Sequence, residues 1–99
     1  MKIEFQSPRP NVLYAKPQGR IDAITAADFG EMIGEKLDDI EKLLLDFSEV
    51  EYVSSMGLRV ILDLQKLMKA QGDMIIAHVK PNVLEIFTMT GFDKILDIM

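Results

Sequence analysis

The fold is decided by the stretch KLLLDFSEVEYVSSMGLRVILDLQKLM, residues 42–68. It begins with three consecutive leucines at positions 43–45, which is typical of a central strand covered on both faces. A polar connection follows, and from Leu58 the apolar residues recur every three or four positions, as in an amphipathic helix. Two adjacent serines stand just before Gly57. The stretch therefore predicts a strand, a loop and a helix, with a pair of serines at the helix entrance.

The serine pair, Ser54 and Ser55, stands where a helix exposes unpaired backbone N–H groups and the positive end of its dipole. Serine is a preferred N-cap residue, so one of the two is expected to cap the helix. The same position favours an anion, and a hydroxyl there could carry a phosphate at little local cost. The residues alone leave open whether the hydroxyl only caps the helix or is also a switch.

The N-terminal residues predict a β-hairpin. Residues 2–6 alternate polar and apolar side chains, and residues 7–10, Ser-Pro-Arg-Pro, end this first strand because proline cannot donate to a strand ladder. Residues 11–16 can pair with the first strand across that turn. Pro17 indicates an edge position or a bulge in the second strand.

A helix is predicted to follow the hairpin and to end at the two aspartates of positions 38–39. Thr25 and Asp28 resemble a capping pair at its start. The positions expected to face inward are Phe29, Met32, Ile33 and Leu37. Gly30 and Gly34 each weaken the helix by about 1 kcal/mol relative to alanine. They either allow close approach to a neighbouring element or are tolerated surface glycines.

Two more apolar segments follow the central stretch. Residues 74–79 predict a second buried strand, and Pro81 and Gly91 fit the first turn and the end of a third helix. Residues 92–99 predict a closing helix or strand. A strand, a helix and another strand imply a right-handed parallel crossover. In the helix of the central stretch, the positions expected to face inward are Val60, Ile61, Leu64, Leu67 and Met68. In the third helix they are Val83, Leu84, Ile86 and Phe87.

These elements predict the α/β class, with a mixed sheet of about four to five strands, opened by a β-hairpin, and three to four helices packed on it. The length predicts one domain, residues 1–99. The net charge is −5, and no cluster of Lys or Arg offers what a phosphate backbone requires, so direct nucleic-acid binding is not expected. There is no cysteine, and no segment approaches the roughly 20 apolar residues that span a bilayer. We expect a cytoplasmic protein with no membrane insertion.

Residues for catalysis are scarce. His78 is the only histidine and falls in the second buried strand, so a structural role is expected rather than that of a general base or ligand. No metal site or nucleotide-binding glycine loop is present in the sequence, and no cofactor is expected. A hydrolase using Ser55 is disfavoured because no nucleophile-elbow motif surrounds it. Among the acidic residues, Asp22 stands out, because it should lie at the same end of the sheet as the loop after Phe47.

At these residues the chain resembles a known family. The stretch LLLDFSEVEYVSSMGLRVIL, residues 43–62, resembles the signature of the STAS domain, in particular that of bacterial anti-sigma factor antagonists. That signature is a buried strand ending in Asp-(Leu/Phe)-Ser, a short loop, Asp/Ser-Ser-x-Gly-Leu and an apolar helix. Residues 19–22 (GRID) with Thr25, Ala26 and Phe29 resemble its first loop and helix, and residues 87–94 (FTMTGFDK) its C-terminal helix end. The resemblance covers nearly the whole chain and implies a STAS-type mixed sheet.

The resemblance implies a partner-switching protein that is not an enzyme. In this family the unphosphorylated antagonist binds an anti-sigma factor that is also a serine kinase, which frees a sigma factor for transcription, and phosphorylation of one serine ends that binding. The phosphoacceptor lies two residues before the glycine, which is Ser55 here, with Ser54 as second choice. The residues expected to bind the partner are Asp22, Ser54, Ser55, Met56, Gly57 and Arg59.

Other roles stay open beside this one. A serine phosphatase would be a further partner of a phosphorylated antagonist. The alternative function is that of a STAS scaffold or transporter-associated module in which Ser55 only caps the helix. Met56 is either an adaptable apolar contact or a core residue. Arg59 stands four residues before Asp63, the spacing of a weak ion pair on an exposed helix face.

Overall fold

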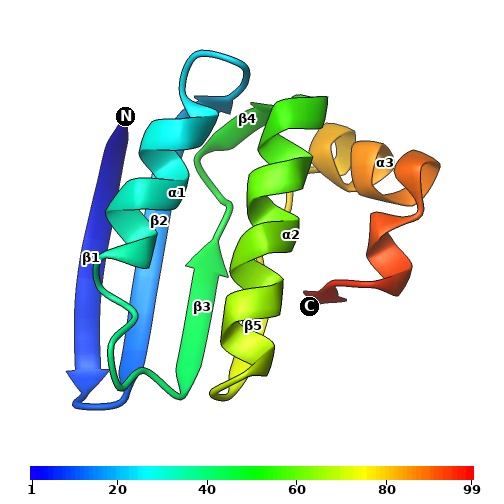
Figure 1. Ribbon diagram of the computed structural model, residues 1–99. Helices are drawn as coiled ribbons and strands as arrows, with labels where there is room; N and C mark the ends of the chain where they lie inside the picture. Colours follow the sequence, from blue (N-terminus) through cyan, green and yellow to red (C-terminus); the bar gives the residue numbers. More distant parts are fainter.

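Residues 1–99 of the computed structural model form one mixed β-sheet with two helices lying across one of its faces (Figure 1). The elements in chain order are β1 (Lys2–Arg9), β2 (Val12–Ile21), α1 (Ala26–Gly34), β3 (Lys42–Asp46), β4 (Val50–Val53), α2 (Ser55–Lys69), β5 (Asp73–Ala77), α3 (Pro81–Thr90), the short 3-10 helix η1 (Phe92–Lys94) and β6 (Asp97–Ile98). The predicted α/β class, the opening hairpin and the mixed sheet are confirmed. No helix is long and apolar enough to cross a bilayer.

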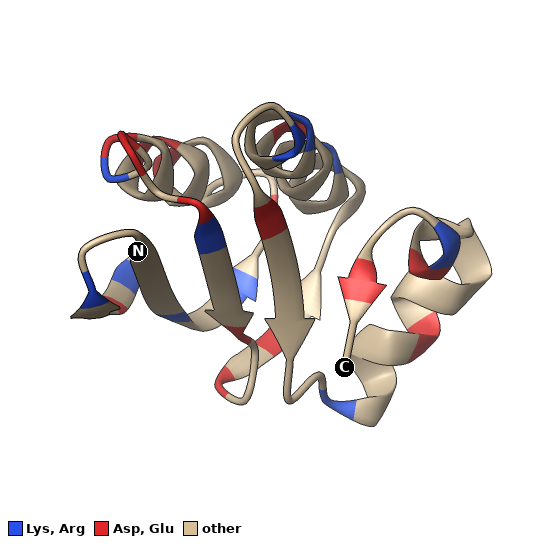
Figure 2. Ribbon diagram, turned by 90° about the horizontal axis from the view of Figure 1, so that it is seen from below, with Lys and Arg blue, Asp and Glu red and all other residues tan.

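The sheet has the strand order β1-β2-β3-β5-β6, and β4 pairs with β2 outside this path. Only β1 runs antiparallel to its neighbour, and the pairs of β2 with β3, β2 with β4, β3 with β5 and β5 with β6 are all parallel. The helices α1 and α2 lie on one face of the sheet, while α3 lies beside the sheet near the edge formed by the last strand, β6 (Figure 2). The carboxyl ends of the parallel strands therefore point to one end of the molecule.

Strand β2 changes its neighbour halfway along its length. Its first residues pair with β3 as far as Ala15, and its last residues pair with β4 from Gly19. Pro17 lies between these two pairings, opposite Ile3 of β1. A residue without an N–H is tolerated where a strand has no neighbour on one side. The switch lets β2 and β4 end together at the upper edge of the sheet in Figure 1.

The polar connection predicted after the central strand contains a strand, β4, so that prediction was wrong. Val50 and Val53 are buried at its two ends, and Glu51 between them is exposed. A strand of four residues with an acidic residue in its middle gives too short an alternation to be recognised. Strand β4 is what carries the chain from β3 to the serine pair.

The two glycines of α1 have different surroundings. A Cβ atom at Gly30 would lie 2.7 Å from Cγ1 of Val60, whereas a Cβ atom at Gly34 would meet nothing within 4 Å. Gly30 therefore allows close approach of α1 to α2, and Gly34 is a tolerated surface glycine. Helix α1 ends at Gly34 and not at the predicted aspartates, although Leu37 is buried as expected.

A cluster of 22 buried residues forms the core between the sheet and the helices. In α2 the positions Ile61, Leu64 and Met68 are buried as predicted. Leu67 is 55% exposed, contrary to prediction, because it lies on the flank of α2 that borders an open groove against α1. In α3 the prediction that Leu84 faces inward is also wrong, since its side chain is exposed.

Helix α3 joins the core through the buried side chains of Val83 and Phe87, and Phe87 also makes an aromatic contact. The rings of Phe47 and Phe87 are both fully buried, with centroids 6.3 Å apart. Pro81 occupies the first turn of α3, and Gly91 ends it with a left-handed φ of 78°, as predicted. The closing segment contains both predicted alternatives, the 3-10 helix η1 and the two-residue strand β6.

Candidate functional site

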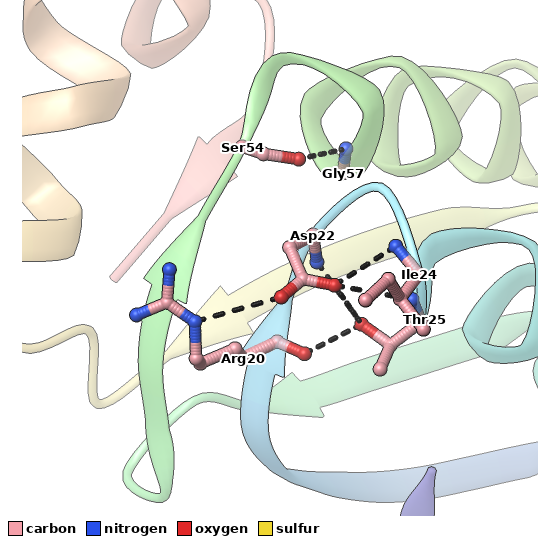
Figure 3. A network of polar contacts seen from close by, with 6 residues as sticks. All are labelled: Arg20, Asp22, Ile24, Thr25, Ser54 and Gly57. Carbon is pink, nitrogen blue, oxygen red and sulfur yellow. Dashed lines mark hydrogen bonds and ion pairs between the residues drawn. The ribbon is translucent and has the colours of Figure 1, made fainter.

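The loop after β2 and the start of α2 meet at the carboxyl ends of two neighbouring parallel strands. Ile21 stands opposite Val53 in the register of β2 and β4, and the N–H of Ser54 donates to the carbonyl oxygen of Ile21 at 2.9 Å. Asp22 and Ser54 follow these strand ends directly and lie beside each other (Figure 3). The sequence reasoning placed Asp22 at the end of the sheet that carries the serine pair, and the structure brings the two together.

The serine that caps α2 is Ser54. Its backbone is extended, with φ −86° and ψ 175°, and its Oγ accepts a hydrogen bond from the N–H of Gly57 at 3.2 Å. This is the geometry of an N-cap, in which a side-chain oxygen satisfies one unpaired N–H of the first helical turn. The hydroxyl of Ser54 is therefore occupied in the fold.

Ser55 is the first residue of α2 and is exposed. Its hydroxyl makes none of the side-chain hydrogen bonds of the structure, in contrast to that of Ser54. The two adjacent serines thus separate the two roles that the sequence left open. One hydroxyl holds the helix start, and the other is free.

Gly57 belongs to the first turn of α2 and is buried. A Cβ atom at this position would lie 2.5 Å from the carbonyl oxygen of Ile21 and 3.0 Å from the side chain of Val53. Any larger residue would push α2 away from the ends of β2 and β4. The glycine therefore sets how closely the serine pair approaches the loop after β2.

The carboxylate of Asp22 organises that loop. Its Oδ1 accepts hydrogen bonds from the N–H of Ile24 at 3.0 Å and of Thr25 at 3.2 Å, and its Oδ2 lies 3.5 Å from Nε of Arg20 (Figure 3). The backbone hydrogen bonds from Ile24 and then Thr25 hold the pKa of Asp22 below its usual value. The guanidinium of Arg20 in turn lies over the ring of Tyr52, at 4.4 Å.

The predicted capping pair at the start of α1 is wrong. Thr25 occupies the N-cap position, but its Oγ1 donates to the carbonyl oxygen of Arg20 at 2.6 Å and accepts from the N–H of Asp22 at 3.0 Å. Asp28 accepts instead from the amino group of Met1 at 2.6 Å. The loop competes successfully for the threonine hydroxyl because Asp22 bends the chain back on itself there.

Two large apolar side chains are exposed on this end of the molecule. Ile24, in the loop after β2, is 89% exposed, and Met56, in the first turn of α2, is 51% exposed. Met56 is therefore not a core residue. Ile24 was missed by sequence reasoning, because a single apolar residue in a polar loop has no periodic pattern, and its exposure becomes visible only in the fold.

Arg59 lies one helical turn after Ser55, and both residues line an open groove of about 460 Å³. The groove runs along α2 towards the end of α3, where Thr90 of α3 and Phe92 of η1 line it. The predicted ion pair between Arg59 and Asp63 does not form, and Arg59 takes part in none of the ion pairs of the structure. Arg59 is thus a free cation beside the free serine.

His78 is not in a buried strand, contrary to prediction. It follows the end of β5 with a left-handed φ of 58°, and its side chain is 68% exposed. Its Nδ1 lies 3.1 Å from Oδ1 of Asp46, a buried carboxylate that also accepts hydrogen bonds from the hydroxyl of Tyr14 and the N–H of Ser48. No hydrogen bond joins His78 to either serine of the pair. No group of three or more acidic or histidine side chains is arranged to hold a metal ion.

Asp46 and its hydrogen-bond partners Tyr14, Ser48 and His78 form a cluster, here called the Asp46 cluster, in which two pKa values are shifted. Burial, the largest single influence on Asp46, acts to raise its pKa, but hydrogen bonds from Tyr14, Ser48 and His78 together outweigh it and lower the pKa to about 2. The hydrogen bond to Asp46, followed by burial, raises the pKa of Tyr14 to about 12. Tyr14 lies on β2, Asp46 at the end of β3 and His78 after β5, so the cluster ties three neighbouring strands together.

Comparison with known proteins assigns the chain to a family. The STAS domain family model matches residues 7–99. The anti-sigma factor antagonist BtrV of Bordetella bronchiseptica is 33% identical over 89 residues, which is 88% of this chain and 77% of BtrV.

Solved structures agree with this assignment at the level of the fold. The crystal structure of an anti-sigma factor antagonist from Mycobacterium paratuberculosis superimposes with a TM-score of 0.86 at 22% identity, covering 98% of this chain and 83% of that one. The anti-sigma factor antagonist SpoIIAA, in its unphosphorylated form, gives a TM-score of 0.83 at 14% identity, covering 99% and 88% of the two chains. Its phosphorylated form, from Bacillus, gives 0.74 at 13% identity, covering 99% and 91%. The match of the family model over residues 7–99, together with the likeness to BtrV, shows that this chain belongs to the STAS domain family.

Proposed function

We propose that this protein is an anti-sigma factor antagonist that binds an anti-sigma factor with serine kinase activity and is released by phosphorylation of Ser55. The observation that carries the proposal is the division between the two serines. Ser54 caps α2 through its Oγ, and Ser55 presents a free, exposed hydroxyl one residue later. The protein is then a substrate of the kinase and not itself a catalyst.

A phosphate on Ser55 would leave the fold intact. Ser55 is at the first position of a helix of 15 residues, where the dipole and the unpaired N–H groups favour a negative charge. The cap from Ser54 does not involve the modified oxygen. The modification therefore acts on the partner surface and not on stability.

The partner surface combines exposed apolar and charged residues. Ile24 and Met56 supply the apolar contacts, and Arg59 supplies a cation. Three of the predicted partner-binding residues support this surface and do not themselves offer free groups to a partner. Asp22 and Ser54 are engaged in the hydrogen bonds of the two loops, and Gly57 is buried.

Phosphorylation ends binding through charge. A phosphoserine adds about −1.5 to −2 charge at neutral pH, and the protein already carries a net charge of −5. The new charge would stand among the residues that the partner covers, so the interface would have to desolvate it or face repulsion. A serine phosphatase would restore the binding form, and the whole cycle would take place in the cytoplasm.

The proposal is tested by incubating the protein with ATP and each histidine-kinase-like serine kinase of its own cell, followed by mapping of the phosphate by mass spectrometry. The expected result is a single phosphate on Ser55. Ser54→Asp is the matched control, since aspartate keeps the N-cap but offers no hydroxyl, and it should still be modified. Ser55→Ala should not be modified. Absence of modification by every such kinase would favour the unphosphorylated scaffold module instead.

A further inference from the structure

Arg59 is an unpaired cation one helical turn from Ser55. Both side chains are exposed, both line the groove along α2, and no ion pair includes Arg59. Side chains four residues apart on a helix are neighbours, with Cβ atoms about 5–6 Å apart. The guanidinium of Arg59 is therefore within reach of a group attached to the oxygen of Ser55.

A phosphate on the oxygen of Ser55 would suit Arg59 in two ways, through the shape of the guanidinium and through the order of the two residues along the helix. The planar guanidinium binds two phosphate oxygens at once, which a lysine ammonium cannot do. An acidic group placed four residues before a basic one is the stabilising order on a helix, because it also agrees with the helix dipole. Asp63 does not compete for Arg59, since the two side chains form no ion pair.

The other charged groups of this region are placed less well. Lys66 lines the same groove but lies about three helical turns beyond Ser55. Arg20 is engaged by the carboxylate of Asp22 at 3.5 Å and lies over the ring of Tyr52. Arg59 is thus the cation that remains for Ser55.

We propose that Arg59 binds the phosphate of phosphorylated Ser55 within the same helix, and that this pairing transmits the modification to the partner surface. The inference rests on the proposed function. In the unmodified protein, Arg59 is free to bind an acidic group of the partner. In the modified protein, the phosphate holds Arg59 against α2 and removes this contact, while its remaining charge repels the same acidic group.

The test uses the full chain with phosphoserine incorporated at position 55 during synthesis, so that no kinase is needed. Phosphorus NMR follows the second ionisation of the phosphate as the pH is varied. We expect the midpoint to be about 0.2 to 0.4 pH unit lower in this chain than in the same chain with Arg59→Gln. Arg59→Lys should keep part of the shift, because it keeps the charge but loses the two-pronged geometry.

Lys66→Gln is the control for the general charge of the groove, and its midpoint should equal that of the parent chain. Circular dichroism checks that every variant is folded. Equal midpoints in the parent chain and Arg59→Gln would overturn the proposal, as would an equal effect of Lys66→Gln. The titration does not depend on any kinase, so it can succeed when no kinase modifies Ser55, and it can fail when one does.

Discussion

At the scale of residues, the adjacent serines Ser54 and Ser55 have different environments. Ser54 is the last extended residue and Ser55 the first helical one, so the oxygen of Ser54 turns back over the helix start while that of Ser55 faces solvent. Helix propensities alone could not separate them, because serine suits both positions, and only the family resemblance favoured Ser55. The separation depends on where α2 begins, which is three residues before the first apolar position of its periodic stripe.

This division predicts unequal effects of two alanine substitutions on stability. Ser54→Ala removes the N-cap and should lower the free energy of unfolding by about 1 kcal/mol. Ser55→Ala removes an exposed hydroxyl without a partner and should change it by less than about 0.5 kcal/mol. Urea denaturation of both variants checks this, and a larger loss in Ser55→Ala would show that the cap is assigned to the wrong serine.

Gly57 predicts a second, steric effect. In Gly57→Ala the new Cβ would clash with the carbonyl oxygen of Ile21, a backbone atom that cannot rotate away. We expect a loss of about 1–3 kcal/mol in the free energy of unfolding. Gly34→Ala is the matched control, since that position is helical and open, and it should be neutral or stabilising by up to about 1 kcal/mol. Equal stability of the two variants by urea denaturation would argue against close packing at Gly57.

At the scale of elements, the predictable parts were those with a strong local pattern. The leucine run of β3, the stripe of α2, and the proline and glycine at the ends of α3 each carry a signal that tertiary contacts do not reverse. Strand β4 escaped because its alternation covers only four residues. His78 was misplaced because the apolar pattern continues to Val79, whereas the chain leaves the sheet after Ala77 with a left-handed turn.

The Asp46 cluster joins three strands and predicts a pH dependence of stability. The pKa of Asp46 is lowered to about 2 in the fold, below its usual value of 3.8, so its contribution to stability is complete above pH 3.8 and is lost as the pH falls towards 2. That contribution is roughly 2 kcal/mol. The pKa of Tyr14 is raised to about 12, so the neutral phenol stabilises the fold below pH 10 and this stability is lost as the pH rises towards 12.

Tyr14→Phe should weaken both limbs of this profile. It removes the hydroxyl that donates to Asp46, which should raise the pKa of that carboxyl and shift acid unfolding to a higher pH. Tyr52→Phe is the control, because Tyr52 contacts Arg20 and not Asp46. The measurement is the thermal midpoint of each protein between pH 2 and pH 12. An unchanged acid limb in Tyr14→Phe would contradict the assigned hydrogen bond.

At the scale of the whole molecule, the fold delivers two loops from distant parts of the chain to one end of the sheet. Strand β2 brings Asp22 and Ile24, and strand β4 brings the serine pair, because the two strands are parallel and end together. Acidic and basic residues are interspersed along the ribbon in Figure 2. With a net charge of −5, the protein is poorly suited to hold a further dianion beneath a partner.

The central claim is that phosphorylation of Ser55 controls binding without unfolding the protein. Calorimetric titration should compare the unmodified chain and the chain with phosphoserine at position 55 against the kinase that modifies it. We predict at least about tenfold weaker binding of the modified chain, with a thermal midpoint within about 2 °C of the unmodified one. Equal affinity of the two forms, or a loss of binding that comes with a large drop in the thermal midpoint, would contradict the account.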